Sequence, residues 1–391
     1  MVYIAAVAMI NALGNSLDEI ATNLVIGKTG LTPNNSWLLH GKQTYVGKVK
    51  REPPNIPEVY KEHNTRNNRL LFAALSQIIS ELEYAIKKYG NDRVAIIMGS
   101  STSGIYEGEL AISKYEQQGV LPENYSYQQQ EMGDSSLFLA NYLGTYGPCY
   151  TVSTACTSSA RAIISGKRLI ESGMVDAALV GGADTLCQLS LNGFASLEQI
   201  SEKLCQPFAK ERVGINIGEA AGLMLLTKEP AELALLGVGE SSDAWHMSAP
   251  HPEGTPAQMA IKMALSEANI QPHQVGYINM HGTATALNDQ MEAKAIHGVF
   301  GSDSPPCSST KHLTGHTLGA AAITEAALAW LIINRSLTLP WQNFTHATID
   351  GSLAKFNLLK EPMQLLKHPI ILSNSFAFGG NNTSILLGKV Q

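Results

Sequence analysis

The strongest constraint on the fold is an alternation of short apolar runs with longer helix-like stretches, which begins at the N-terminus. Helix-like stretches are expected at 67–88 and 156–172. Apolar runs that read as buried strands lie at 3–10, 94–99, 149–153, 177–182 and 222–227. Buried strands that alternate with helices are typical of layered α/β folds, in which helices cover the faces of a sheet.

A second series of the same make-up begins near residue 231. Its strands are expected at 234–239, 275–280, 371–375 and 383–387, and its helices at 256–269, 289–299 and 317–334. Two successive sets of this kind predict a duplicated α/β architecture, joined near the break Lys228-Glu229-Pro230. We therefore expect two halves, 1–230 and 231–391.

The composition is that of a folded globular protein. Of the 391 residues, 45% are hydrophobic and 15% are charged, and the formal net charge is -6. This negative charge argues against a surface built to bind nucleic acid or acidic lipid. The N-terminus lacks a signal-peptide pattern, and no later run reaches the roughly 18 uninterrupted apolar residues of a membrane-spanning helix.

The cysteines predict free thiols in a reducing cytoplasm, and no metal site. They are odd in number and scattered, without a CxxC pair or a zinc-ligand spacing, at Cys149, Cys156, Cys187, Cys205 and Cys307. Two predicted helices begin with runs of small residues, at 155–160 and 315–322. Small side chains let backbones approach closely, so we place both helices in the middle of the molecule.

Cys156 is the best candidate nucleophile in the chain. It directly follows the apolar run 149–153, at the first turn of a predicted helix that ends near Gly173. Unpaired N–H groups and the positive end of the helix dipole are expected to lower the thiol pKa and favour the thiolate. A free cysteine is more often a small buried hydrophobe, and that interpretation suits the other four.

Two histidines in the second half offer partners for a thiolate. His281 follows the predicted strand 275–280 and opens the string His-Gly-Thr-Ala-Thr. His316 lies five positions after Lys311, at the start of the second small-residue helix. Either histidine alone is more often structural, but together with an activated cysteine they indicate nucleophilic catalysis.

The segment 374–382 contains a glycine pair followed by amides, between two predicted strands. Gly379 and Gly380 favour a hairpin turn on their own account. They would equally let backbone N–H groups approach a substrate and form an oxyanion site. The spacing does not choose between these two interpretations.

Four motifs in this order resemble the elongating β-ketoacyl-acyl-carrier-protein synthases, of the thiolase superfamily. They are Thr154-Ala155-Cys156-Thr157-Ser158-Ser159, His281-Gly282-Thr283-Ala284-Thr285, the stretch from Ser309-Thr310-Lys311 to Gly315-His316, and Asn374-Ser375-Phe376 with Gly379-Gly380-Asn382; Val180-Gly181-Gly182-Ala183-Asp184 is a supporting string. The resemblance implies a five-layer αβαβα sandwich of two duplicated βαβαβαββ halves. It also implies a homodimer, with a heterodimer as the other possibility.

The resemblance implies a decarboxylative condensation between acyl units on acyl carrier protein. Cys156 would take the acyl chain from the carrier's phosphopantetheine, and malonyl carrier protein would then enter the same site. His281 and His316 would promote decarboxylation and stabilise the enolate, while Lys311 orders the site electrostatically. Glu292 would support this network, and no resident cofactor is implied.

The same resemblance assigns the substrate contacts. The amides of Cys156 and Phe378 would form the oxyanion hole, with the Phe378 ring as a gate between two acyl pockets. Thr283 and Thr285 would hydrogen-bond the pantetheine arm. Phe194 would line the acyl tunnel, and Gly379 would contact the substrate through its backbone.

The sequence also departs from the family pattern. Ala286 and Asn288 stand where Pro and Gly are usual, and Ala209 and Val213 stand where acidic residues are common. These changes weaken the case for housekeeping fatty-acid elongation and make a specialised pathway, of a polyene or polyketide-like kind, plausible. Candidates for a basic patch that receives the acidic carrier are Arg66, Arg69, Lys210 and Arg212.

Three other interpretations stay open. A coenzyme A-dependent thiolase commonly uses a second cysteine near its C-terminus, and no cysteine follows Cys307. The initiating synthases use Cys-His-Asn, which the second histidine and Lys311 oppose. A non-catalytic partner subunit that sets chain length in a heterodimer typically lacks the cysteine that this chain keeps.

Overall fold

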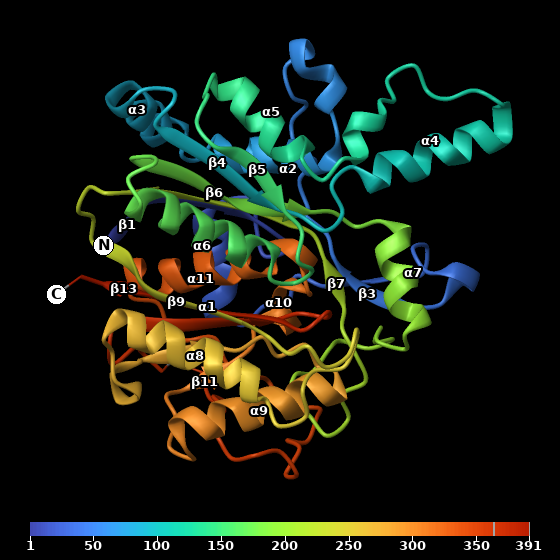
Figure 1. Ribbon diagram of the computed structural model, residues 1–391. Helices are drawn as coiled ribbons and strands as arrows, with labels where there is room; N and C mark the ends of the chain where they lie inside the picture. The colour runs from blue at the N-terminus through green and yellow to red at the C-terminus, as the bar shows by residue number, and fades with distance from the viewer. Residues whose placement is uncertain (363, 391) are drawn as a thin grey trace.

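The computed structural model describes residues 1–362 and 364–390. The strands of its main sheet are β1 (Val2–Ile10), β4 (Val94–Gly99), β5 (Cys149–Val152), β6 (Ala177–Asp184), β8 (Ala220–Thr227), β9 (Leu233–Ser242), β10 (Tyr277–Asn279), β11 (Cys307–Ser308), β12 (Ile370–Phe376) and β13 (Asn381–Lys389). Within the described residues they form one mixed sheet in the order β11-β10-β12-β13-β9-β1-β8-β6-β4-β5 (Figure 1). Every strand expected from the sequence is present, although one of them is less buried than expected, and β11 is an additional short strand of this sheet.

The two halves of this sheet have the same topology. In the first half the order is β5-β4-β6-β8-β1, and in the second it is β11-β10-β12-β13-β9. In each half the second strand in the chain pairs in parallel with the third and fourth strands. The fifth strand pairs antiparallel with the fourth and the first. The duplicated α/β architecture is therefore present in the strand order itself.

A short antiparallel contact joins the two halves edge to edge. Val2 of β1 pairs with Leu235 of β9, and Tyr3 pairs with Ala234. The sequence break at Lys228-Glu229-Pro230 lies between β8 and β9. The first strand of each half is thus also the seam between them.

The two halves of the sheet alternate with three layers of helices, which gives five layers in all. The helices concerned are α2 (Arg66–Leu75), α3 (Ile79–Tyr89), α5 (Asp134–Leu143), α6 (Ser158–Glu171), α8 (Thr255–Ala268), α9 (Ala286–Phe300) and α11 (Ala321–Arg335). The first three cover the outer face of the N-terminal half, and α8 and α9 cover the outer face of the C-terminal half (Figure 1). Helices α6 and α11 lie between the two halves and contact each other.

The central layer explains the small residues at the starts of α6 and α11. The backbone N–H of Ile323 donates to the Ser159 hydroxyl over 3.0 Å, a direct bond between the two helices. The stretch Leu318–Arg335 is long and apolar enough by composition to cross a membrane, but 83% of it is buried. Its apolar character is that of a core helix, in contact with both halves of the sheet.

Two sequence expectations need correction. The stretch 67–88 is not one helix, because α2 ends at Leu75 and α3 begins at Ile79. The backbone leaves the helical path between them, where the Gln77 side chain hydrogen-bonds both the N–H and the carbonyl of Met9 in β1. The run 149–153 is not a buried strand, because β5 lies at the edge of the sheet and Tyr150 is 38% exposed.

A projecting arm was not predicted. Helix α4 (Ile105–Gln118) and the loop that follows it extend away from the body of the molecule (Figure 1). Large apolar side chains are exposed along the arm, at Leu110, Ile112, Tyr115, Val120, Leu121 and Tyr127. Exposed apolar side chains gathered on one projecting element are typical of an interaction surface.

Candidate active site

Cys156 lies in a sharp turn between strand β5 and helix α6. The sequence predicted that Cys156 lies in the first turn of the helix. The helix begins only at Ser158, so Cys156 precedes it by two residues. Ala155 has φ +51°, a left-handed conformation that costs energy for any residue except glycine. The Ser158 hydroxyl holds this turn, because it accepts from the Thr154 N–H over 2.9 Å and donates to the Ala155 carbonyl over 2.6 Å.

The structure brings His281 and His316 to this thiol. The Cys156 sulfur and one nitrogen of each imidazole all lie within 4.8 Å of one another. The two rings are perpendicular, at 89°, with centroids 5.3 Å apart. The cysteine comes from the first half of the fold and both histidines from the second, so the site exists only where the halves meet.

Both histidines are neutral and share one tautomer. Burial lowers the pKa of each imidazole well below its ordinary value, and the nearby charge of Lys311 lowers it further. The Nδ1 atom of His316 accepts from the Leu318 N–H over 3.1 Å, and Nδ1 of His281 lies 3.3 Å from the Lys311 ammonium, which can only donate. Each ring therefore carries its proton on Nε2, so each supplies one N–H donor.

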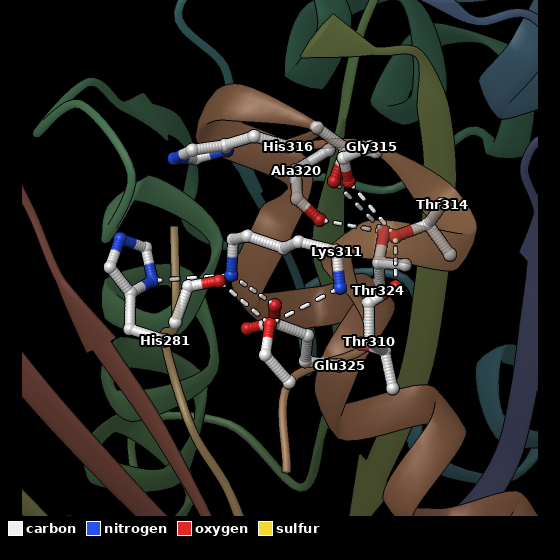
Figure 2. Close-up of polar contacts among 12 residues, drawn as sticks. His281, Thr310, Lys311, Thr314, Gly315, His316, Ala320, Thr324 and Glu325 are labelled. Carbon is white, nitrogen blue, oxygen red and sulfur yellow. Dashed lines mark hydrogen bonds and ion pairs between the residues drawn. The ribbon is translucent and has the colours of Figure 1, made fainter. Parts of the chain in front are cut away.

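Lys311 is buried in an ion pair with Glu325. Figure 2 shows its ammonium between the His281 ring and the Glu325 carboxylate. Both side chains are nearly inaccessible, at 2% and 3% exposed. Burial raises the pKa of Glu325 to about 7, against the lowering effect of Lys311.

Sequence reasoning missed Glu325, although a signal was available. It is the one charged residue before Arg335 in the apolar helix α11. A charge buried in such a helix needs a partner of opposite sign. Lys311 is the cation that the sequence motifs place in the site, so it was the natural partner for Glu325.

The thiol pKa does not follow the sequence expectation. Cys156 is 6% exposed, and burial raises its pKa to about 11. The charge of Lys311 and the backbone N–H groups of Phe378 and of Cys156 itself oppose this shift without reversing it. Desolvation of the thiolate thus outweighs the favourable end of α6, and the free protein holds a thiol.

The Phe378 segment is a hairpin turn that also faces the nucleophile. It connects β12 to β13, with Gly379 and Gly380 at φ +86° and +81°. Its Phe378 N–H lies close enough to Cys156 to lower the thiol pKa. The two interpretations of this segment are therefore compatible.

Two cavities meet at Cys156. A cavity of about 370 Å³ is lined by Ser101, Thr102, Ile105, Ser153, Ala155, Cys156, Cys187, Leu189, Ser190, Phe194 and Leu318. A small chamber on the histidine side is lined by Cys156, Phe194, Gln199, Ile215, His281, Thr283, Thr285, Asn288, His316, Phe376 and Phe378. The rings of Phe194 and Phe378 lie 5.7 Å apart, where the cavity and the chamber adjoin.

The remaining candidates lie around the chamber. The hydroxyls of Thr283 and Thr285 are 2.9 Å apart in its wall. Glu292 accepts from the backbone N–H groups of His281 and Gly282 over 2.8 and 2.7 Å, so it fixes the loop that carries the histidine. Burial raises the pKa of Glu292 to about 8.

Two members of the expected basic patch are occupied in the interior. Arg66 is 6% exposed and pairs with Glu219 over 2.6 Å. The Arg212 side chain is 8% exposed and pairs with Asp350 over 2.6 Å. Neither is available to an acidic partner, because each is already engaged by a carboxylate.

The residues Cys156, His281 and His316 are of types that also bind transition metals. Their ligand atoms are close enough together for one ion. The Lys311 ammonium lies 3.3 Å from His281, however, and a fixed positive charge at that distance opposes a second cation.

The layered fold and the Cys-His-His site together define a class, and the chain belongs to the β-ketoacyl synthase family, within the thiolase superfamily. The family's N-terminal domain, described as "Beta-ketoacyl synthase, N-terminal domain", matches residues 1–231. Its C-terminal domain, "Beta-ketoacyl synthase, C-terminal domain", matches residues 233–345. The expected five-layer fold of this superfamily is confirmed.

Several known proteins are similar to this chain over its whole length. One solved structure is that of the ketosynthase ApeO in complex with its chain length factor ApeC, from Xenorhabdus doucetiae. One chain of that structure is 56% identical in sequence to this chain, with a TM-score of 0.97 over 100% of this chain and 98% of that one. A chain of the ishigamide ketosynthase/chain length factor is 25% identical, with a TM-score of 0.89 over 100% and 99%. The 3-oxoacyl-[acyl-carrier-protein] synthase 2 of a Synechocystis species is 27% identical over 100% of this chain and 98% of its own length.

Proposed function

We propose that the protein is a β-ketoacyl-acyl-carrier-protein synthase that condenses a Cys156-bound acyl chain with malonyl carrier protein. One observation carries the proposal. The Cys156 sulfur lies within 4.8 Å of two imidazole nitrogens, at the point where the cavity and the chamber meet. A nucleophile that lies between two hydrogen-bond donors and a cavity of about 370 Å³ suits two successive acyl transfers at one atom.

In the first step the Cys156 thiol exchanges with the thioester of an acyl carrier protein. Its sulfur attacks the thioester carbonyl, and the N–H groups of Phe378 and Cys156 stabilise the oxyanion. The bond to the pantetheine sulfur breaks, and that sulfur leaves with the proton that the thiol gave up. Because burial raises the thiol pKa to about 11, the step starts from the thiol form of Cys156.

In the second step malonyl carrier protein occupies the chamber. The bond between its carboxylate and the neighbouring carbon breaks, carbon dioxide leaves, and the electron pair forms an enolate. The two Nε2–H groups of His281 and His316 stabilise the enolate oxygen, because neutral imidazoles can donate without prior protonation. The enolate carbon attacks the Cys156 thioester, and the cysteine sulfur leaves as a thiolate that takes a proton from water.

The 370 Å³ cavity is proposed to hold the acyl chain, and Thr283 and Thr285 to bind the pantetheine arm. The substrates arrive on the phosphopantetheine of acyl carrier protein, in the cytoplasm, and this scheme requires no resident cofactor. The pathway is fatty-acid or specialised polyene or polyketide-like synthesis. Similarity to chains of two ketosynthase/chain length factor complexes supports the specialised branch.

A second, related chain is the proposed partner, as a homodimer or a heterodimer. Strand β5 is an edge strand, and the apolar arm formed by α4 and its loop projects from the same half of the fold. The alternative role, a non-catalytic subunit that sets chain length, is favoured by the same two complexes but opposed by the complete Cys-His-His set.

The deciding experiment is intact mass spectrometry after incubation with acyl carrier proteins of several chain lengths. The wild type should gain one acyl group, which Cys156→Ser and Cys156→Ala should lose. Cys187→Ser is the matched control, because Cys187 lines the same cavity and its loss should leave the adduct in place. An adduct that persists on both Cys156 variants, or no β-ketoacyl product with malonyl carrier protein, would overturn the proposal.

A further inference from the structure

Asp184 is a buried carboxylate with an unusual number of donors. It ends strand β6 and is 0% exposed. Its Oδ1 accepts from the Ser100 hydroxyl, the Ser101 N–H, and the N–H and hydroxyl of Thr102, each over 2.8 Å. Its Oδ2 accepts from the N–H of Gly319. Three of these five donors are backbone amides, so both oxygens must act as acceptors.

The two groups of donors belong to different parts of the site. Ser101 and Thr102 are in the wall of the 370 Å³ cavity, in the first half of the fold. Gly319 is in the second half, three residues after His316. Asp184 therefore ties the cavity wall to the backbone turn that carries the histidine.

That turn is strained and closely packed. Leu318 has φ +53°, which is unfavourable for a leucine and persists only where surrounding contacts enforce it. The same Leu318 supplies the N–H that His316 Nδ1 accepts. A Cβ added at Gly319 would lie 2.7 Å from Asp184 Oδ2 and 2.7 Å from the Ser101 hydroxyl, so this contact has no room for another residue.

We propose that Asp184 is a positioning residue, which holds the turn 317–320 so that the Leu318 N–H keeps the proton of His316 on Nε2, facing Cys156. This inference rests on the proposed function for its consequence, because a His316 with its proton on Nδ1 offers no donor to an enolate. Asp184 accepts hydrogen bonds from both the loop 100–102 and the turn 317–320. It therefore also connects the wall of the acyl cavity to His316.

The direct test is the tautomer of His316, read from nitrogen chemical shifts of ¹⁵N-histidine-labelled protein. His316→Ala identifies the signal among the 11 histidines. In the wild type, Nδ1 should be unprotonated and hydrogen-bonded. In Asp184→Asn an amide NH₂ must face one of the donors, so the turn should relax and the His316 signal should become a mixture of tautomers.

Asp176→Asn is the matched control, because Asp176 adjoins the other end of β6 and pairs with Arg93 and Lys228 at the surface. In Asp176→Asn the His316 signal should match that of the wild type. A wild-type tautomer in Asp184→Asn would overturn the proposal. This readout requires no turnover, so it decides the positioning role even if the proposed condensation fails.

The second readout is decarboxylation of malonyl carrier protein in a double-mutant cycle. Asp184→Asn should slow it about 10- to 100-fold, the range for losing a charge-assisted hydrogen bond. In His316→Ala, adding Asp184→Asn should cause little further loss, because the two residues act in one chain of contacts. Additive losses would show that Asp184 acts elsewhere and would overturn the proposal.

Should Asp184→Asn fail to fold, Gly319→Ala makes the same test from the other side of the contact. The added methyl group displaces Asp184 from the turn without removing its charge. It should shift the His316 tautomer in the same direction. An unchanged tautomer in that variant would count against the proposal.

Discussion

At the scale of single residues, burial and the charge on Lys311 together account for the state of the two histidines. Burial lowers the pKa of His281 and of His316 and the Lys311 charge lowers both further, while Glu325 keeps Lys311 itself from being an uncompensated buried charge. The site is thereby prepared to donate hydrogen bonds to a developing negative charge. It is not prepared to hold a thiolate in advance, as the raised thiol pKa shows.

Because the histidines act as donors and do not activate the thiol, we expect His316→Ala to affect decarboxylation far more than acylation. Acylation of Cys156 needs the thiol and the backbone N–H donors, so it should be retained in part. Decarboxylation needs both imidazole donors, so it should fall by about 10²–10³-fold, the usual cost of removing one oxyanion donor. Release of labelled carbon dioxide and intact mass measure the two steps on the same sample, and unchanged decarboxylation would contradict the assigned role.

The second prediction concerns the pH dependence of stability. The pKa of Glu292 is raised to about 8 by burial, so the folded protein keeps a proton that the unfolded chain releases above its ordinary pKa of 4.5. Stability from this group is therefore present at low pH and lost as pH rises towards 8. Glu292→Gln should remove that slope, of at most about 1.4 kcal/mol per pH unit.

Urea unfolding of the wild type and Glu292→Gln at several pH values from 5 to 8 measures the difference. A constant offset between the two proteins is expected from the altered hydrogen bonds to His281 and Gly282. The informative quantity is the change of this offset with pH. If it stays flat, Glu292 is ionised in the folded protein and the two N–H donors outweigh its burial.

At the scale of elements, the turn between β12 and β13 faces helix α7 (Gln188–Ser196), which carries Phe194. The Phe194 and Phe378 rings lie together, with the flexible pair Gly379-Gly380 beside them. A rigid aromatic ring on a backbone of this kind can move between positions and open one space to the other.

Phe378→Ala should therefore change which acyl chains are accepted, or the order in which the two substrates enter. Alkylation of Cys156 by iodoacetamide should persist, because the small reagent does not need the gate. Phe194→Ala is the companion variant and should change the preferred chain length. Competition among acyl carrier proteins, with products read by mass, makes the measurement; an unchanged acyl preference and order in Phe378→Ala would leave the segment as an ordinary hairpin.

The sequence predicted elements well where their periodicity reflects burial, as in the strands of both halves and in α6, α8 and α11. It failed where a side chain bonds to a distant element, as Gln77 does with Met9, since such a contact leaves no periodic signal. It also failed for α4, whose apolar residues face solvent in the isolated chain.

The candidate site follows the same division. The segments that carry Cys156, His281 and His316 could be read from local residue types, and the structure brings those residues together. The raised thiol pKa could not, because it depends on how deeply the folded chain buries Cys156. The Lys311–Glu325 pair was missed although the lone acid in the apolar helix α11 was a signal for it.

At the scale of the whole molecule, the arm formed by α4 and its loop predicts an assembly. Tyr115→Glu with Leu121→Glu places charges on exposed apolar positions of the arm, so it should weaken association without destabilising the fold. Light scattering after size exclusion, on the chain alone and on the chain co-expressed with a related subunit, measures the mass. Met174→Glu, at an exposed apolar position outside the arm, is the control; an unchanged mass in the arm variant would place the interface elsewhere.

The order of the duplicated sheet has a consequence for synthesis of the chain. Strand β1 is made long before its principal partner β8, with which it pairs Tyr3 opposite Thr227. At roughly 5–20 residues per second, the ribosome needs on the order of 10–40 s to supply that partner. Through this interval the nascent protein carries a nearly unbroken apolar strand, so its N-terminal segment should be a preferred site for chaperones during translation.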